Sequence, residues 1–412
     1  MTKTLGPLTA AADDTSATWY RILRKAGLVY IYSRVCVLAG AAIVAAEIRA
    51  DINQGAELPG RVFADPNIVG RPVPKTAVSP MLDVLSSWDG VWYLRIVRLG
   101  YPHHVQADVT YLVPDARVAF FPVFPMLVRA VDTVVPGGDT IAALFTNFIL
   151  GAIVIFLLGL LARELYGEQV AAKAMVLGAI FPGSFVLSFA YAEALLLVLG
   201  MGCLWCLMKR RWIGAGLLAA LATATRPNGL ALVLACAVAA VIAIRRERDW
   251  VSLVAPILAP LGFLAFQLWV NHHTGEAGVW FRVQSEAWGE SASYGLTAIR
   301  KSIEAFASPL TSPTNILTAA SVVTMVVMIY FARRKVLPPP MLAYCVGILA
   351  LMLLPNTVTA RPRFLYSALP LLISAAAFLH SFRREWWPYV IGACSAGLVT
   401  LTALYGVRGA IP

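Results

Sequence analysis

Long blocks of apolar side chains recur along most of this 412-residue sequence, and they constrain the fold more than any other feature. Each block runs for about 15 to 20 residues, close to the ~20 helical residues that cross a hydrocarbon core about 30 Å thick. Charged residues make up only 13% of the chain, against about 25% in ordinary globular proteins. This pattern excludes an anchored soluble enzyme, a disordered chain and a disulfide scaffold. It predicts an all-α, polytopic transmembrane helical bundle.

We expect about 11 spans, within a range of about 10 to 13, in a single domain over residues 1–412. The predicted spans are 25–48, 140–161, 170–188, 190–208, 212–225, 229–244, 250–270, 314–332, 338–355, 364–380 and 386–406. The stretch 119–135 is also apolar, but its prolines predict a shallow or re-entrant helix. A cleaved signal peptide is the alternative for the first span, and the many later spans favour an uncleaved helix.

Short connections rich in Lys and Arg predict which span ends face the cytoplasm. Such connections, which alternate along the chain, are 209–211, 245–248, 333–335 and 383–384. Segment 1–25 is then cytoplasmic, 49–139 forms the first extracytoplasmic loop, and 140–412 forms the rest of the bundle. The net charge of +11 fits this bias and contact with anionic lipid headgroups. Since the basic residues form no single face, we expect membrane lipids and no nucleic acid as partners.

The most distinctive motif of the first outer loop is Trp88-Asp89-Gly90-Val91-Trp92-Tyr93. Its aromatic density predicts an amphipathic helix at the membrane interface. An interfacial belt explains the tryptophans, but it does not explain an acid close to where the hydrocarbon begins. A partly desolvated carboxylate can act as a general base toward a hydroxyl acceptor. Asp89 is therefore the candidate catalytic residue.

Two further motifs interrupt helices on the outer side. Phe120-Phe121-Pro122-Val123-Phe124-Pro125 is either a simple turn or irregular backbone that lines a cavity, the setting that a membrane protein tolerates. Phe181-Pro182-Gly183-Ser184 ends one helix, and Glu193 opens the next. Glu193 either stabilises the positive end of that helix dipole or belongs to the site.

Arginines on the same side predict an anionic ligand. Arg226 interrupts an apolar run in Thr225-Arg226-Pro227-Asn228-Gly229, and Arg361 and Arg363 open a later span. A lipid phosphate suits the planar guanidinium fork. For Arg361 and Arg363, a salt bridge to Glu193 or Asp89 is the alternative.

The outer loop 271–313 carries His272, Arg282 and Gln284, which either bind a sugar or form a solvated loop. Adjacent histidines do not have the spacing of metal ligands, so no metal is expected. The sequence has no Walker loop and no G-x-G-x-x-G motif, which leaves cytoplasmic nucleotide binding without support. An activated donor would have to arrive through the membrane.

In order and spacing, these motifs resemble those of PIG-V-type mannosyltransferases, which are integral-membrane GT-C glycosyltransferases. The resemblance covers about residues 85 to 290, including Arg211-Trp212-Ile213-Gly214-Ala215-Gly216 running to Arg226, and is weaker over 361–370. It implies a large first extracytoplasmic loop with interfacial helices. It also implies inverting transfer of mannose from polyprenyl-phosphate mannose to a lipid-linked or glycolipid acceptor at the extracytoplasmic face.

The resemblance assigns the role of base to Asp89 and donor-phosphate binding to Arg226; Arg361 and Arg363 join Arg226 on physical grounds. The candidate substrate-binding residues are Trp88, Trp92, Tyr93, Glu193, Asn228, His272, Arg282 and Gln284. No cofactor or metal is expected, because arginines can neutralise a single leaving phosphate.

Three alternatives stay open. A related enzyme could use polyprenyl-phosphate arabinose or galactose with the same parts. A lipid or sugar transporter would show internal repeats and charges near the bilayer midplane, whereas this sequence has no evident repeat and its outer polar residues gather at one face. A membrane scaffold would leave the outer arginines without a role.

Overall fold

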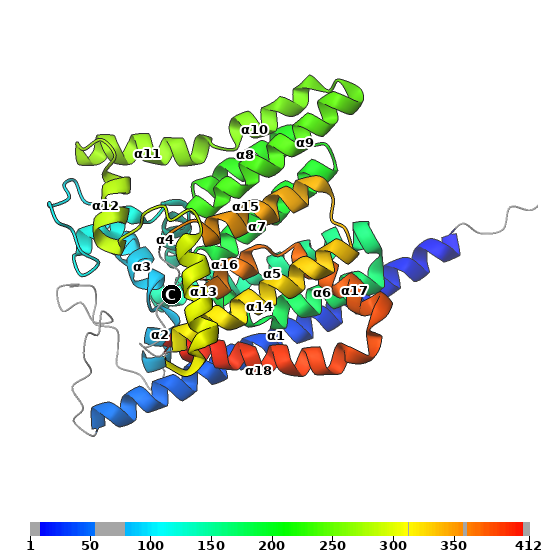
Figure 1. Ribbon diagram of the computed structural model, residues 1–412, viewed down its shortest axis with the longest axis horizontal. Coiled ribbons are helices and arrows are strands. Elements are labelled where there is room, and N and C mark those ends of the chain that lie inside the picture. Colours follow the sequence, from blue (N-terminus) through cyan, green and yellow to red (C-terminus); the bar gives the residue numbers. More distant parts are fainter. Residues whose placement is uncertain (1–8, 54–78, 312, 357–360, 407–412) are drawn as a thin grey trace, which may run out of the picture.

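The computed structural model describes residues 9–53, 79–311, 313–356 and 361–406, and it is helical over 81% of the chain. The described part contains no named strand, and its one isolated β-bridge joins Ala292 to Pro355. The predicted all-α fold is therefore confirmed (Figure 1).

Most helices run roughly side by side in one bundle (Figure 1). The bundle helices are α1 (Thr9–Asn53), α5 (Asp139–Tyr166), α6 (Glu168–Ile180), α7 (Glu193–Met208), α8 (Trp212–Thr223), α9 (Ala231–Glu247), α10 (Val254–Leu258), α11 (Leu261–Thr274), α14 (Pro313–Arg334), α15 (Pro339–Leu353), α17 (Leu371–Phe382) and α18 (Trp387–Gly406). Among the described residues, six helical segments are long and apolar enough to cross a membrane, and four apolar helices are shorter. The exact count of 11 spans is not confirmed, because breaks such as the one at Pro182 shorten several apolar blocks.

Close backbone contact between helices explains several small residues in the bundle. α1 packs along α18 and α6, while α9 packs along α15. A Cβ on Gly40 would lie 2.8 Å from the Val399 carbonyl oxygen, and one on Gly347 would lie 2.9 Å from Ala231 Cβ. Small residues of this kind let membrane helices approach each other.

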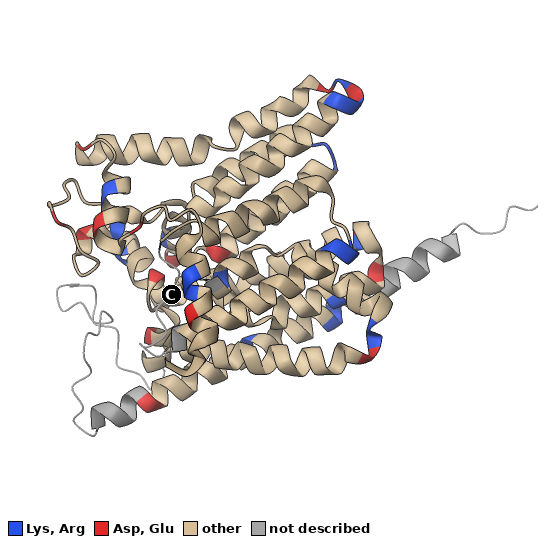
Figure 2. Ribbon diagram, viewed as in Figure 1, with Lys and Arg blue, Asp and Glu red and all other residues tan. Residues whose placement is uncertain are grey.

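The basic connections gather at one end of the bundle (Figure 2). Arg210 pairs with Glu247 at 2.5 Å, and Lys209 pairs with Glu164 at 2.6 Å. Lys335 lies over the ring of Phe382. These contacts join connections that are far apart in the sequence, so the predicted alternation of basic connections corresponds to one charged end in space.

Short helices cover the opposite end. They are α2 (Ser79–Leu85), α3 (Asp89–Leu99), η1 (Pro114–Ala119), α4 (Val123–Asp132), α12 (Val279–Trp288), α13 (Leu296–Ala307) and α16 (Arg361–Ser367). Further 3-10 turns are η2 (Pro182–Leu187), η3 (Pro227–Leu230), η4 (Trp250–Leu253), η5 (Pro309–Thr311) and η6 (Arg384–Trp386). The segment 271–313 is thus largely helical and not simply a solvated loop.

The expected interfacial helix forms as α3, but it is mostly buried within the protein. Trp92 stacks on Phe120 and meets Trp288 edge to face, with ring centroids 5.8 and 5.6 Å apart. These rings border a second apolar core between the first outer loop, α11 and α12. The prediction of a helix lying at the membrane surface was wrong in this respect, because α11 and α12 supply a protein surface that covers the aromatic face.

The prolines of the motif at 120–125 lie where a helix tolerates them. Pro122 is the N-cap of α4 and Pro125 is in its first turn, where backbone N–H groups have no intrahelical partner. The motif therefore starts a short helix that packs on α3 and α5.

Candidate active site

Asp89 is placed by an irregular turn at the start of α3. Trp88 has a positive φ of 56°, a conformation that is costly for a bulky side chain. Its indole N–H donates to the Tyr405 carbonyl at 2.8 Å, which holds the turn against α18. A Cβ on Gly90 would lie 3.3 Å from Ala190 Cβ, so the absence of a side chain there lets α3 start close to the chain that leads into α7.

Four charged side chains converge at this point. Asp89 Oδ2 accepts from Arg363 at 2.8 Å and from Arg226 at 3.2 Å. Arg226 also donates to Glu193 Oε2 at 2.9 Å, and Arg363 lies 3.7 Å from Glu193 Oε1. We call Asp89, Glu193, Arg226 and Arg363 the charged cluster. It joins four segments that are up to 274 residues apart.

The charged cluster is largely buried, with 14% of the Asp89 side chain exposed and 9% or less of the other three. Burial opposes ionisation of Asp89, but Arg363 and Arg226 outweigh it and lower the pKa of that carboxyl below its ordinary value. Asp89 is therefore ionised at neutral pH.

Several buried polar atoms around the cluster have no hydrogen-bond partner within the described residues. They are Glu193 Oε1, the Nε atoms of Arg226 and Arg363, and the hydroxyls of Tyr191 and Tyr405. The Arg363 guanidinium lies 5.6 Å from the centroid of the Tyr191 ring, and Tyr405 is within electrostatic reach of Arg363, Glu193 and Asp89. Buried polar groups are usually satisfied, so unused bonding capacity here is a feature of a site that accepts a polar ligand.

The break between α6 and α7 delivers Glu193. Arg34 on α1 donates to the Ala179 and Ser184 carbonyls at 3.1 and 2.9 Å. Asn147 on α5 donates to the Phe189 and Tyr191 carbonyls at 2.5 and 2.7 Å. These two side chains satisfy carbonyls that the broken helix leaves unpaired, so the irregular chain is held rigidly within the bundle.

Arg226 and Arg363 come from two further breaks. Arg226 has extended backbone between α8 and η3, directly before Pro227, because a residue that precedes proline is disfavoured in a helix. Arg363 is in the first turn of α16, which packs on η2, α14 and α15.

Other predicted site residues border the cluster or support it. Tyr93 on α3 is buried and interacts electrostatically with Arg226 and Asp89. Asn228 is buried in η3. Trp88 and Trp92 make the turn and stacking contacts described above. The side chain of Arg361 lies outside the described residues.

The remaining predicted residues make other contacts. Arg282 pairs with Glu276 and Glu286 at 2.6 and 2.8 Å and donates to the carbonyls of Val105 and Gln106. It thus clamps the first outer loop onto α12. Gln284 donates to the Ala119 carbonyl at 3.4 Å, and His272 is exposed on the last turn of α11.

Two tyrosines of the site were missed by sequence reasoning. Tyr191 precedes Glu193 by two residues, and that spacing was the available signal. Tyr405 lies in the last apolar helix, α18, without a local motif. Only the packing of α18 against η2 brings it to the cluster.

A family model described as Mannosyltransferase (PIG-V) matches residues 30–256, more than half of the chain. No curated protein matches the sequence. Two solved structures share limited similarity. One is ArnT from Cupriavidus metallidurans bound to undecaprenyl phosphate, with 11% identity, a TM-score of 0.46 and coverage of 80% of this chain and 76% of that one.

The other is the Archaeoglobus fulgidus oligosaccharyltransferase in its apo form, with 16% identity and a TM-score of 0.41. That alignment covers 71% of this chain and 48% of the oligosaccharyltransferase.

Proposed function

Because the chain belongs to the PIG-V mannosyltransferase family, we propose that it transfers mannose from a polyprenyl-phosphate mannose donor to a lipid-linked or glycolipid acceptor. Its many apolar helices make it a multi-pass membrane glycosyltransferase. The observation that carries the proposal is the charged cluster, in which two buried arginines flank one ionised carboxylate.

Arg226 and Arg363 supply the donor-phosphate site in this proposal. Each guanidinium is planar and can form paired hydrogen bonds with phosphate oxygens. Both have an Nε atom without a hydrogen-bond partner among the described groups. Arg361, on the same turn of α16, is a further proposed phosphate ligand. These cations would also stabilise the phosphate as it leaves, which is the work that a metal performs in other transferases.

Asp89 is the proposed general base. A bound donor phosphate would compete with its carboxylate for Arg226 and Arg363. Weaker pairing would raise the proton affinity of Asp89 and so make it a better base toward an acceptor hydroxyl. A base on one side of the sugar and a phosphate clamp on the other is the arrangement that inversion requires.

The proposed reaction takes place at the extracytoplasmic face. The basic end of the bundle would face the cytoplasm, following the bias of short loops. The charged cluster is at the opposite end, so the donor would present its phosphate there while its tail stays in the bilayer.

Radiolabelled transfer from polyprenyl-phosphate mannose into membrane lipids tests the proposal. Wild type should transfer label, and Asp89→Asn at equal expression should lose at least about 100-fold, the lower range for a general base. Asp108→Asn is the matched control, because Asp108 is an exposed acid in the same outer loop, and it should retain activity.

Equal transfer by wild type and Asp89→Asn would refute the role of Asp89. Absence of transfer by wild type would reject mannose as the donor sugar. Donors carrying arabinose or galactose would then distinguish another transferase from a transporter, which would transfer none of them.

A further inference from the structure

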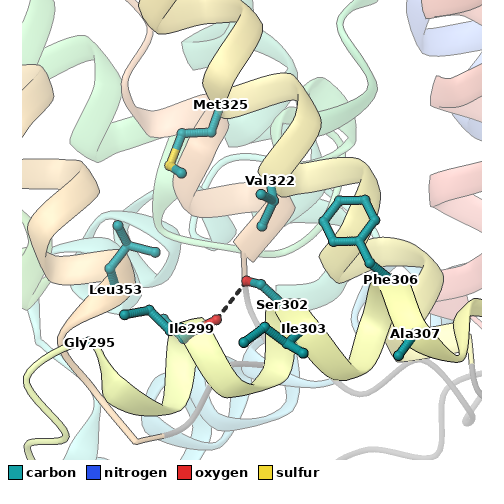
Figure 3. Close-up of a pocket in the computed structure, with 10 residues that line it drawn as sticks. Gly295, Ile299, Ser302, Ile303, Phe306, Ala307, Val322, Met325 and Leu353 are labelled. Carbon is teal, nitrogen blue, oxygen red and sulfur yellow. Dashed lines mark hydrogen bonds between the residues drawn. The ribbon is translucent and has the colours of Figure 1, made fainter.

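An open cavity of about 760 Å³ lies between α13 and α14 (Figure 3). Ile299, Ile303 and Phe306 line it from α13, and Val322 and Met325 point into it from α14. We call this cavity the α13–α14 groove. Its volume is within the range of about 300–1,000 Å³ that is typical of ligand pockets.

The wall of the groove offers almost no polar contact to an occupant. Ser302 carries the one hydroxyl among the lining side chains, and it donates to the Ala298 carbonyl at 2.6 Å (Figure 3). An occupant would therefore be held by apolar burial and not by directed hydrogen bonds.

The groove opens outward on an amphipathic helix. The exposed fractions of Ile299, Ile303 and Phe306 are 62%, 64% and 54%. Arg300 and Lys301, on the other side of α13, pair with Glu304. A helix with these two faces lies at the boundary between headgroups and acyl chains, so the groove begins at the depth where a lipid tail begins.

The groove also continues toward the charged cluster. Leu353, at the end of α15, lines it. The next residues pair with the chain that enters α13, since Ser293 N donates to the Leu354 carbonyl and Asn356 N donates to the Ser291 carbonyl. Both α14 and α15 pack on α16, the helix that carries Arg363.

We propose that the α13–α14 groove binds the prenyl chain of a prenyl-phosphate donor. The inference rests on the proposed function and extends it from the phosphate to the tail. A phosphate at Arg363 would leave its chain beside α16, where α14 and α15 lead directly to an apolar groove. This continuity favours the donor lipid as occupant over an unrelated bilayer lipid.

Adjacent valines on α14 provide the test. Val322 lines the groove, whereas Val323 is 50% exposed and does not line it. The purified variants Val322→Trp and Val323→Trp are each titrated with a long-chain prenyl phosphate and with an analogue of two isoprene units. Val322→Trp should weaken long-chain binding at least about tenfold, equivalent to about 1.4 kcal/mol. It should leave binding of the short analogue unchanged, and Val323→Trp should bind both as wild type does.

Equal long-chain affinity in the two variants would overturn the proposal, and so would an equal loss for both chain lengths. Retained binding of the short analogue shows that the variant is folded. Because this readout is binding, it is separate from sugar transfer. Wild type that binds the long chain in the groove but transfers no sugar would refute the proposed function and leave the groove assignment in place.

Discussion

Asp89 uses one carboxylate oxygen, Oδ2, to accept from both Arg226 and Arg363. The structure thus contains the salt bridge that was the alternative to phosphate binding for Arg363. The two roles are compatible, because the same guanidinium can pair with a carboxylate first and with a phosphate when the donor arrives. Breaking a buried ion pair by removing one partner is costly, so a donor phosphate would have to replace the lost charge.

We expect Arg363→Lys to weaken donor use although it keeps the positive charge. Lysine cannot reproduce the paired donors of the guanidinium. Losing one hydrogen bond to a charged group costs about 1.5–3 kcal/mol, which corresponds to roughly a 10- to 100-fold rise in the donor KM. Initial rates at varied donor concentration measure this effect.

Arg129→Lys is the control for that substitution, because Arg129 is exposed on α4 near the same end of the bundle. It should keep the wild-type donor KM. An unchanged donor KM in Arg363→Lys would mean that Arg363 has only a structural pairing with Asp89.

At the level of elements, the charged cluster depends on interruptions of apolar helices. Glu193 follows the break after α6, Arg226 lies between α8 and η3, and Arg363 is in the short helix α16. A continuous helix would point these side chains along its own surface. The breaks instead turn them toward a common centre, with Arg34 and Asn147 satisfying the freed carbonyls.

Gly183 in η2 sets the distance between two of these elements. A Cβ there would lie 2.6 Å from Tyr366 Cβ and 2.9 Å from the Pro362 carbonyl oxygen. We expect Gly183→Ala to displace α16 and Arg363, with a loss of stability of about 1–3 kcal/mol from overpacking and a higher donor KM. Thermal unfolding in detergent and donor kinetics measure the two effects.

Gly27→Ala on α1 is the matched control, because a Cβ at Gly27 meets nothing within 4 Å. It should unfold no more easily than wild type, since alanine favours a helix. Wild-type kinetics and stability in Gly183→Ala would show that α16 adjusts without affecting the site.

For the whole molecule, the separation of charge between the two ends of the bundle predicts its orientation. We expect a cysteine introduced at Asp108 to react with an impermeant maleimide on intact cells. A cysteine introduced at Arg246 should react only after the membrane is opened. The six native cysteines are buried or partly buried, so the wild-type chain provides the background. The opposite labelling pattern would place the charged cluster on the cytoplasmic side.

Much of the architecture was predictable because its causes are local in the chain. Apolar blocks predicted membrane helices, and Pro182 predicted the end of α6. The span count was less predictable, since proline and glycine divide apolar blocks into helices too short to cross alone. The burial of α3 was also missed, because it depends on α11 and α12, far along the chain.

The sequence by itself determined that this is a helical membrane protein with an acid and several arginines placed at helix breaks, and its motifs were sufficient to indicate the family. Transfer of apolar side chains out of water and the geometry of proline act over short stretches, so their effects can be recognised locally. Only the tertiary structure decided that Asp89 meets Arg363 and Arg226, that Arg282 clamps a loop, and that Tyr405 borders the site. Those contacts join residues more than 100 positions apart, and they depend on how the helices pack.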